Sequence, residues 1–292
     1  MNKKQYSKFL EDKEKAHLVK LIGALTTLES NIVNILSQAP IQDGKLFDLS
    51  WAVNARTQVF QSMEVMLGDM SEQFGGLTEV NENLLSLLGD TGAFTQIPSE
   101  AISGLIDITF AGFEEIANSY GDEISKQMYQ MTLTNTTQAE ATQVIRGKIN
   151  GVYQTSDKDE IESLVELVNT TTDEAIRQKA INRLHSAYGA DKLGNNLRRY
   201  ASTYVRDATS QYSRASSMAM AREAGIQKWE YFGDTEKDTR DFCRSMLGRV
   251  MTEDEIREKW SSESWQGKSD GDPFIVCGGY NCKHEWLPVF EN

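Results

Sequence analysis

Two of the three cysteines and one of the three histidines lie close together near the carboxyl terminus, in CGGYNCKHEW (residues 277–286). Thiolate and imidazole groups are zinc ligands, and they also form the nucleophile and base of cysteine hydrolases. With the remaining cysteine they offer a ligand set of three thiolates and one imidazole, composed of Cys243, Cys277, Cys282 and His284. These residue types are compatible with a structural zinc site, a catalytic thiol, a disulfide or buried cysteines without further chemistry.

The zinc interpretation rests on ligand type more than on spacing. Zinc knuckles usually supply two cysteines as C-x2-C, and this sequence contains no such pair. Cys282 and His284 are two residues apart, which places both side chains on one face of an extended segment. A small unit with little core gains most from a metal that ties its segments together. A structural zinc ion is therefore the one cofactor that the sequence suggests.

The other interpretations have weaker support. A catalytic Cys282 or Cys243, activated by His284, would need an orienting carboxylate or amide in a recognisable pattern. The sequence contains no nucleophile elbow, P-loop, dinucleotide fingerprint or H-E-x-x-H motif. A Cys243–Cys282 disulfide would need an oxidising compartment. Buried cysteines, with Gly278 and Gly279 forming a tight bend, remain an alternative, and we expect no enzyme.

The overall charge argues against strong binding to nucleic acid. The chain of 292 residues has a net charge of −13, and binding to phosphates depends on cationic surface. DNA contact would therefore require a local basic stripe. The candidates for such a stripe lie on one predicted helix and are Arg198, Arg199, Arg206 and Arg214. A solvated helix face is the alternative interpretation of the same arginines.

The amino terminus and the hydrophobic segments indicate where the protein is made. The first residues, MNKKQYSKFLEDKEKAH, alternate charges and lack the apolar core of a secretory signal. The chain contains no continuous run of about 18 apolar residues, the length expected of a membrane span. We therefore expect a soluble protein in a reducing compartment, without a membrane partner.

Hydrophobic residues recur at intervals of three and four along most of the chain, which predicts a mostly helical protein. Prolines are absent between Pro98 and Pro273, so long helices are permitted there. Residues 75–99 are rich in glycine, asparagine and threonine and predict a loop with one short helical turn. Helices are expected over about 4–37, 50–74, 99–124, 135–150, 156–168, 172–188 and 190–224.

The pattern changes after Gly225, where a small α+β unit is expected. The motif Thr252-x-x-Glu255 predicts a capping box that begins a short helix through Trp260. Short strands are expected at 226–231, 247–251, 274–276 and 284–290. The predicted fold class is mostly α with a small C-terminal α+β domain. Three regions are expected: an N-terminal helical region (1–98), a middle helical region (99–190) and the α+β domain (191–292).

The order of short motifs over about residues 195–290 resembles the phage head-morphogenesis family, the minor capsid proteins similar to the F protein of phage Mu. The matching pieces are MAREAG (220–225), WEYFGD (229–234), DTEKDTRDFC (234–243), LGRV (247–250) and GGYNCKHEWLPV (278–289). The motif residues to which the resemblance assigns a structural role are Asp238, Thr239, Arg240, Gly278, Gly279, Asn281 and Pro288. The remaining two thirds of the chain matches this family only in being helical.

The resemblance implies a structural protein of the virion head that acts through protein contacts. Members of the family are associated with the portal and the capsid interior, and they aid procapsid assembly and genome packaging or ejection. The implied partners are the portal protein, the major capsid or scaffold protein and packaged DNA. The implied locations are the head interior or portal vertex, and the host cytoplasm during assembly. Asp238 and Arg240 would pair or cap the helix bearing Cys243. A zinc-stapled nucleic-acid-binding module is the alternative function.

Overall fold

The computed structural model describes residues 2–88, 99–150, 196–279 and 282–289, with isolated positions between 160 and 183. Contacts divide the chain into two compact units, each assembled from separate segments. Residues 1–13, 75–109 and 206–292 form one unit, here called the sheet unit, and residues 14–74 and 110–205 form the other, here called the bundle unit. The predicted region boundaries at 98 and 190 fall on residues outside the described ones.

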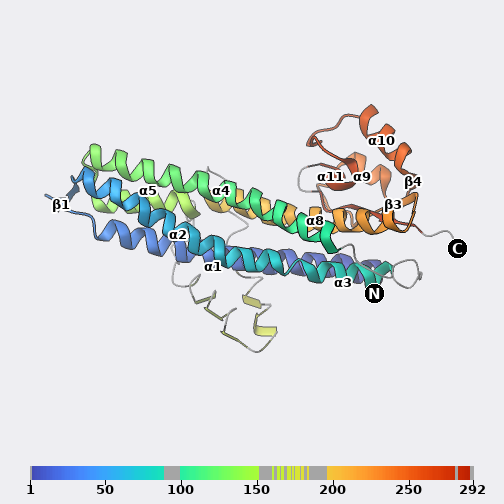
Figure 1. The fold of residues 1–292 in the computed structure, drawn as a ribbon, viewed down its shortest axis with the longest axis horizontal. Coiled ribbons are helices and arrows are strands. Elements are labelled where there is room, and N and C mark those ends of the chain that lie inside the picture. The colour runs from blue at the N-terminus through green and yellow to red at the C-terminus, as the bar shows by residue number, and fades with distance from the viewer. Residues whose placement is uncertain are drawn as a thin grey trace. The chain divides into compact units, whose positions relative to one another are not determined.

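The bundle unit is built from long antiparallel helices (Figure 1). Its elements include most of α1 (Lys3–Ser37) and α2 (Leu49–Gly75), the second part of α4 (Ser99–Leu133), and α5 (Gln138–Asn150). The predicted hydrophobic stripes face inward and form its core, which contains Leu21, Leu25, Leu28, Ile32, Val59, Met63, Met70, Phe113, Ala117 and Ile124. These four helices confirm the predicted ones to within a few residues, except that α4 extends past residue 124.

A tight hairpin connects α1 to α2. Its strands β1 (Ile41–Gln42) and β2 (Lys45–Leu46) pair in antiparallel fashion. Asp43 and Gly44 both have positive φ, 51° and 76°, as the two central residues of a type I′ turn require. Asp43 and Gly44 thus form a tight turn, and the two short strands are an addition to the sequence prediction.

Among the described helices, α1 is the one whose length and apolar composition would allow it to cross a membrane. More than half of that apolar stretch is buried inside the protein. The central helix of a packed bundle and a membrane-crossing helix share both properties. The composition of α1 therefore does not distinguish between them.

The sheet unit contains a three-stranded antiparallel sheet with β3 (Lys228–Phe232) at its centre, between β4 (Val250–Thr252) and β5 (Glu285–Pro288). Tyr231 pairs with Trp286, and Trp229 pairs with Met251 on one side and Pro288 on the other. The other elements of this unit include α3 (Thr78–Leu88), part of α8 (Leu197–Glu223), α9 (Asp241–Met246), α10 (Glu253–Ser262) and α11 (Pro273–Val276). The predicted fold class, mostly α with a small α+β unit, is confirmed.

Two local predictions are wrong. Residues 274–276, expected as a strand, lie in the short helix α11 because Pro273 occupies its first turn and the Asp272 carboxylate accepts the N–H of Phe274. Part of the segment expected as a loop at 75–99 forms the three-turn helix α3, in which Val80 and Leu84 are buried. Helix propensity alone underestimates the tendency of such a segment to form a helix, because packing against the rest of the protein stabilises it.

The predicted capping box and three of the predicted strands are present. The capping box of α10 is present, since the Thr252 side chain accepts the Glu255 N–H and the Glu255 side chain accepts the Thr252 N–H. The predicted strands at 226–231, 247–251 and 284–290 correspond to β3, β4 and β5. The helices predicted at 156–168 and 172–188 lie largely outside the described residues.

Candidate metal centre

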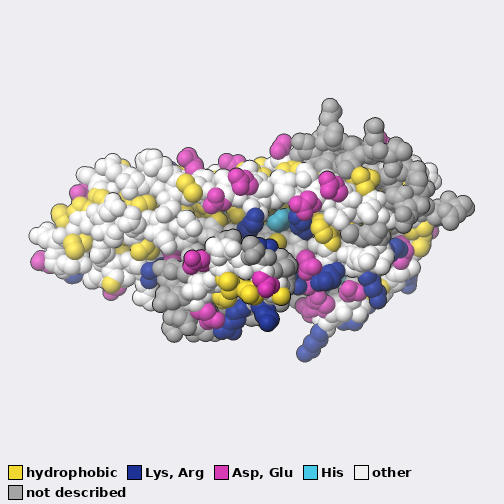
Figure 2. Space-filling view, turned by 90° about the horizontal axis from the view of Figure 1, so that it is seen from below, with side chains coloured by type: hydrophobic (Ala, Val, Ile, Leu, Met, Phe, Trp, Pro, Cys, Tyr) yellow, Lys and Arg dark blue, Asp and Glu magenta, His cyan; other side chains and the backbone are white. Residues whose placement is uncertain are grey.

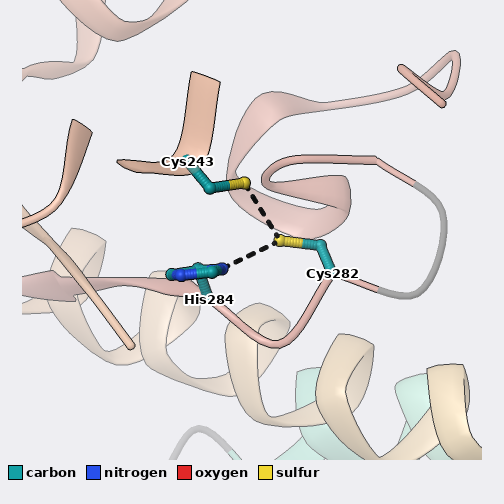
Figure 3. A group of neighbouring side chains, drawn as sticks. All are labelled: Cys243, Cys282 and His284. Carbon is teal, nitrogen blue, oxygen red and sulfur yellow. Dashed lines mark hydrogen bonds between the residues drawn. The ribbon is translucent and has the colours of Figure 1, made fainter. Parts of the chain in front are cut away.

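Three buried side chains of the sheet unit converge on one point (Figure 3). Helix α9 contributes Cys243, and the segment that leads into β5 contributes Cys282 and His284. Cys243 Sγ lies 3.9 Å from Cys282 Sγ, which lies 3.6 Å from His284 Nδ1. All three potential ligand atoms lie within 4.8 Å of one another. The group could therefore hold a metal ion.

The distances in this group fit a tetrahedral zinc site. With Zn–S bonds of about 2.3 Å and Zn–N bonds of about 2.0 Å, tetrahedral angles place two sulfurs about 3.8 Å apart and a sulfur and a nitrogen about 3.5 Å apart. The observed Cys243–Cys282 and Cys282–His284 separations agree with these values to about 0.1 Å. Two of the three edges of the group therefore match a tetrahedral zinc site.

Cys277 does not belong to this group, which corrects the four-ligand prediction. Its Sγ donates a hydrogen bond to the carbonyl oxygen of Phe274, at 3.5 Å, and burial raises the pKa of its thiol to about 12. The Cys277 backbone has a φ of 48°, because the chain reverses direction here at the end of α11. The structure therefore brings together two of the three cysteines with His284.

The two cysteines of the centre differ in the pKa of their thiols. The hydrogen bond between Cys243 Sγ and Cys282 Sγ, with His284 and Arg214 nearby, lowers the pKa of the Cys282 thiol. The same bond and burial raise the pKa of Cys243. The Gly278 N–H also donates to Cys282 Sγ, at 3.1 Å. These contacts favour the thiolate form at Cys282 over that at Cys243.

The predicted tight bend at Gly278 and Gly279 is present. A Cβ atom on Gly278 would lie 2.2 Å from Cys243 Sγ, so the backbone passes directly against the two cysteine side chains. Gly279 has a φ of 100°, and a Cβ there would lie 2.1 Å from the carbonyl oxygen of Gly267. Asn281, assigned to the same motif, lies outside the described residues. The two glycines are required by close approach and by backbone conformation.

Arg214, predicted to contact DNA, is instead a buried structural residue. Its side chain is 5% exposed, and its guanidinium donates to the carbonyl oxygens of Ile275, at 2.8 Å, and of Cys282. Glu285, which is also buried, accepts a hydrogen bond from Ser213 at 3.2 Å, and burial raises the pKa of the Glu285 carboxyl. Arg214 thus connects α8 to the segment that carries the cysteines.

The other predicted DNA-contacting arginines divide into buried and accessible side chains. Arg198 is buried and donates to the Asn150 carbonyl oxygen at 3.0 Å, so its predicted DNA contact is also wrong. Arg199 is exposed and lies against the Tyr200 ring, and Arg206 is half-buried. Helical spacing alone did not reveal which side of α8 faces the protein.

The Asp238-Thr239-Arg240 motif forms the loop before α9. Arg240 is the N-cap residue of α9 without a side-chain capping bond, and its Nε donates to the Gln266 carbonyl oxygen at 3.2 Å. Thr239 Oγ1 accepts the Glu236 N–H at 2.7 Å, and Arg244 donates back to the Thr239 carbonyl oxygen. The described contacts of Arg240 and Thr239 involve backbone carbonyls, and the predicted side-chain cap on α9 is not formed.

Tyr231 is a residue of the centre that the sequence prediction missed. Its hydroxyl lies 3.4 Å from Cys243 Sγ and 3.7 Å from Cys282 Sγ. Tyr231 and Trp229 alternate with exposed or half-buried neighbours along β3, so both point to the same buried face. The alternation in WEYFGD indicated a strand, but the position of this face above α9 depends on the tertiary structure.

No protein-family model matches the chain, and neither the curated proteins nor the solved structures provide a match.

We expect Cys282→Ser to destabilise the sheet unit even without metal, by about 1–3 kcal/mol, because a hydroxyl is a shorter group that cannot replace the buried thiolate and its contacts. Denaturant unfolding in the presence of a chelator measures this change, with Ser261→Ala on exposed α10 as the control. Unchanged unfolding of Cys282→Ser would refute the prediction.

Proposed function

We propose that this chain is a structural minor head protein of a tailed phage, associated with the portal and the capsid interior. In that role it aids procapsid assembly and genome packaging or ejection. The observation that carries the proposal is the ordered set of five motifs between residues 220 and 289. Three of these motifs supply Tyr231, Cys243, Gly278 and Cys282, which meet in one buried centre. Their order along the chain therefore serves a single three-dimensional arrangement.

The burial of the centre supports a structural role rather than catalysis. Cys243 is 1% exposed and Cys282 is 7% exposed, so a substrate would not reach either sulfur. Cysteine nucleophiles generally occupy partly exposed, electropositive positions. The contacts of Cys282 and Arg214 instead join α8, α9 and β5 within one small core.

We propose zinc as the metal of this centre, because two sulfurs and an imidazole at tetrahedral separations match its ligand preference. The expected result is about one zinc ion per chain by elemental analysis of purified protein. Chelation is expected to lower the melting temperature of the sheet unit, since the binding free energy of a structural metal adds to the stability of the fold. Metal-free protein with unchanged melting after zinc addition would contradict the zinc proposal.

The phage role is tested by following the protein through particle assembly. We expect it to copurify with procapsids and with mature virions from lysates of infected cells. Deleting its gene is expected to leave particles that are defective in assembly or in infection. Absence from both kinds of particle, with the protein abundant in the lysate, would overturn the proposal.

A zinc-stapled nucleic-acid-binding module receives less support. Arg198 and Arg214 are buried, and Figure 2 shows basic side chains interspersed with acidic ones on the face that it draws. Arg199 and Arg206 remain the candidates for contact with packaged DNA. Affinity for DNA that falls steeply with salt and weakens in Arg199→Ala would favour this alternative.

A further inference from the structure

The metal centre contains a fourth potential ligand atom besides Cys243 Sγ, Cys282 Sγ and His284 Nδ1. With a Zn–O bond of about 2.0 Å, a tetrahedral site places an oxygen ligand about 3.5 Å from each sulfur. The Tyr231 hydroxyl lies 3.4 Å from Cys243 Sγ and 3.7 Å from Cys282 Sγ. With the S–S and S–N distances, four of the six edges of one tetrahedron are thus matched by the four side chains.

The position of the Tyr231 hydroxyl is set by rigid packing. The ring is fully buried and lies parallel to the His284 ring, with centroids 5.4 Å apart. It also meets the Trp286 ring edge-on at 4.6 Å and the Phe242 ring at 6.4 Å. Because the ring is held on three sides, its hydroxyl already points at the sulfurs, and metal binding would cost little further side-chain entropy.

Cys277 is the other side chain that could complete the site. Its sulfur faces the Phe274 carbonyl oxygen, and its backbone adopts a positive φ that closes α11. Directing Cys277 Sγ at the centre would break its hydrogen bond to that oxygen, whereas the Tyr231 hydroxyl already lies beside both sulfurs. The geometry therefore favours Tyr231.

We infer that the phenolic oxygen of Tyr231 is the fourth ligand of a closed zinc site, completed by two thiolates and one imidazole. This inference rests on the proposed zinc centre. On binding, the protons carried by Cys243, Cys282 and Tyr231 are released to solvent, which leaves two thiolates and one phenolate as ligands. Two thiolates and one phenolate with Zn²⁺ leave one negative charge. The buried guanidinium of Arg214, which donates to the Cys282 carbonyl oxygen, lies close enough to balance it.

The test compares the wild-type protein with Tyr231→Phe and Cys277→Ser. Competition with a zinc chelator gives the affinity, and Co²⁺ substitution gives the coordination through its visible absorption. Substitutions of residues outside the ligand set typically lower metal affinity by about 10–100-fold. We expect Tyr231→Phe to lower the zinc affinity by more than this and to alter the cobalt spectrum. Cys277→Ser is expected to keep both the affinity and the spectrum of the wild type.

A measurement on the wild-type protein tests the role of Tyr231 even if the variants fail to fold. Zinc addition to metal-free protein is expected to produce the ultraviolet difference absorption of one ionised tyrosine. If zinc binds without that absorption, or if Tyr231→Phe keeps the wild-type affinity and spectrum, the role of Tyr231 is refuted and the zinc centre stands. Weakened binding in Cys277→Ser would identify Cys277 as the ligand instead. Failure of the wild type to bind zinc would overturn the zinc centre itself.

Discussion

Arg214→Met is expected to destabilise the sheet unit by about 3–5 kcal/mol, the usual cost of removing one partner from a buried ionic network. Methionine fills much of the volume of the aliphatic part of the arginine side chain but has no hydrogen-bond donor. The carbonyl oxygens of Ile275 and Cys282 would lose their donors, and the buried Glu285 carboxyl would lose its neighbouring positive charge. Denaturant unfolding followed by tryptophan fluorescence measures the loss, because Trp229 and Trp286 lie in the same core.

Two control variants separate the burial of Arg214 from its charge. Arg199→Met removes an exposed arginine from the same helix and is expected to change stability by less than about 0.5 kcal/mol. Arg214→Lys keeps the charge but loses the planar fork that reaches two carbonyls, so its stability is expected to lie between those of the wild type and Arg214→Met. Equal free energies of unfolding for Arg199→Met and Arg214→Met would show that Arg214 does not join α8 to the segment that carries the cysteines.

Gly278→Ala is expected to destabilise the sheet unit by about 3 kcal/mol and to abolish metal binding, because overpacking of a buried site costs about 1–3 kcal/mol or more. The added methyl group would lie 2.2 Å from Cys243 Sγ and 2.9 Å from Cys282 Sγ, well inside van der Waals contact. Both sulfurs are buried, so relief requires moving α9 or the β5 segment. Thermal unfolding and zinc competition measure the two effects.

Gly104→Ala is the matched control for this substitution. Gly104 lies inside helix α4 in the sheet unit, and nothing lies within 4 Å of the position of its Cβ. Alanine there is expected to raise stability by about 0.5–1 kcal/mol through helix propensity. Normal zinc affinity in Gly278→Ala would mean that the glycine is not required by its contact with the cysteines.

Much of the helical architecture was predictable because periodic hydrophobic stripes are a local signal. The stripe through Leu21, Leu25, Leu28 and Ile32 identified α1, and Thr252 with Glu255 identified the start of α10. Prediction failed at 274–276, where three apolar residues suggested a strand but Asp272 and Pro273 began a helical turn. A short apolar run fits a strand and a helix equally well, so the flanking residues determine which of the two forms.

The potential ligand types of the candidate metal centre were evident from the sequence, and so was the need for glycine in the bend. Only the tertiary structure decided which atoms meet, because Cys243, Tyr231 and Cys282 are brought together by α9 packing against the sheet. It turned Cys277 toward Phe274, placed the Tyr231 hydroxyl beside the sulfurs and buried Arg214. Residue type determines what chemistry a side chain can perform, whereas its partners depend on contacts between distant segments, which no local pattern encodes.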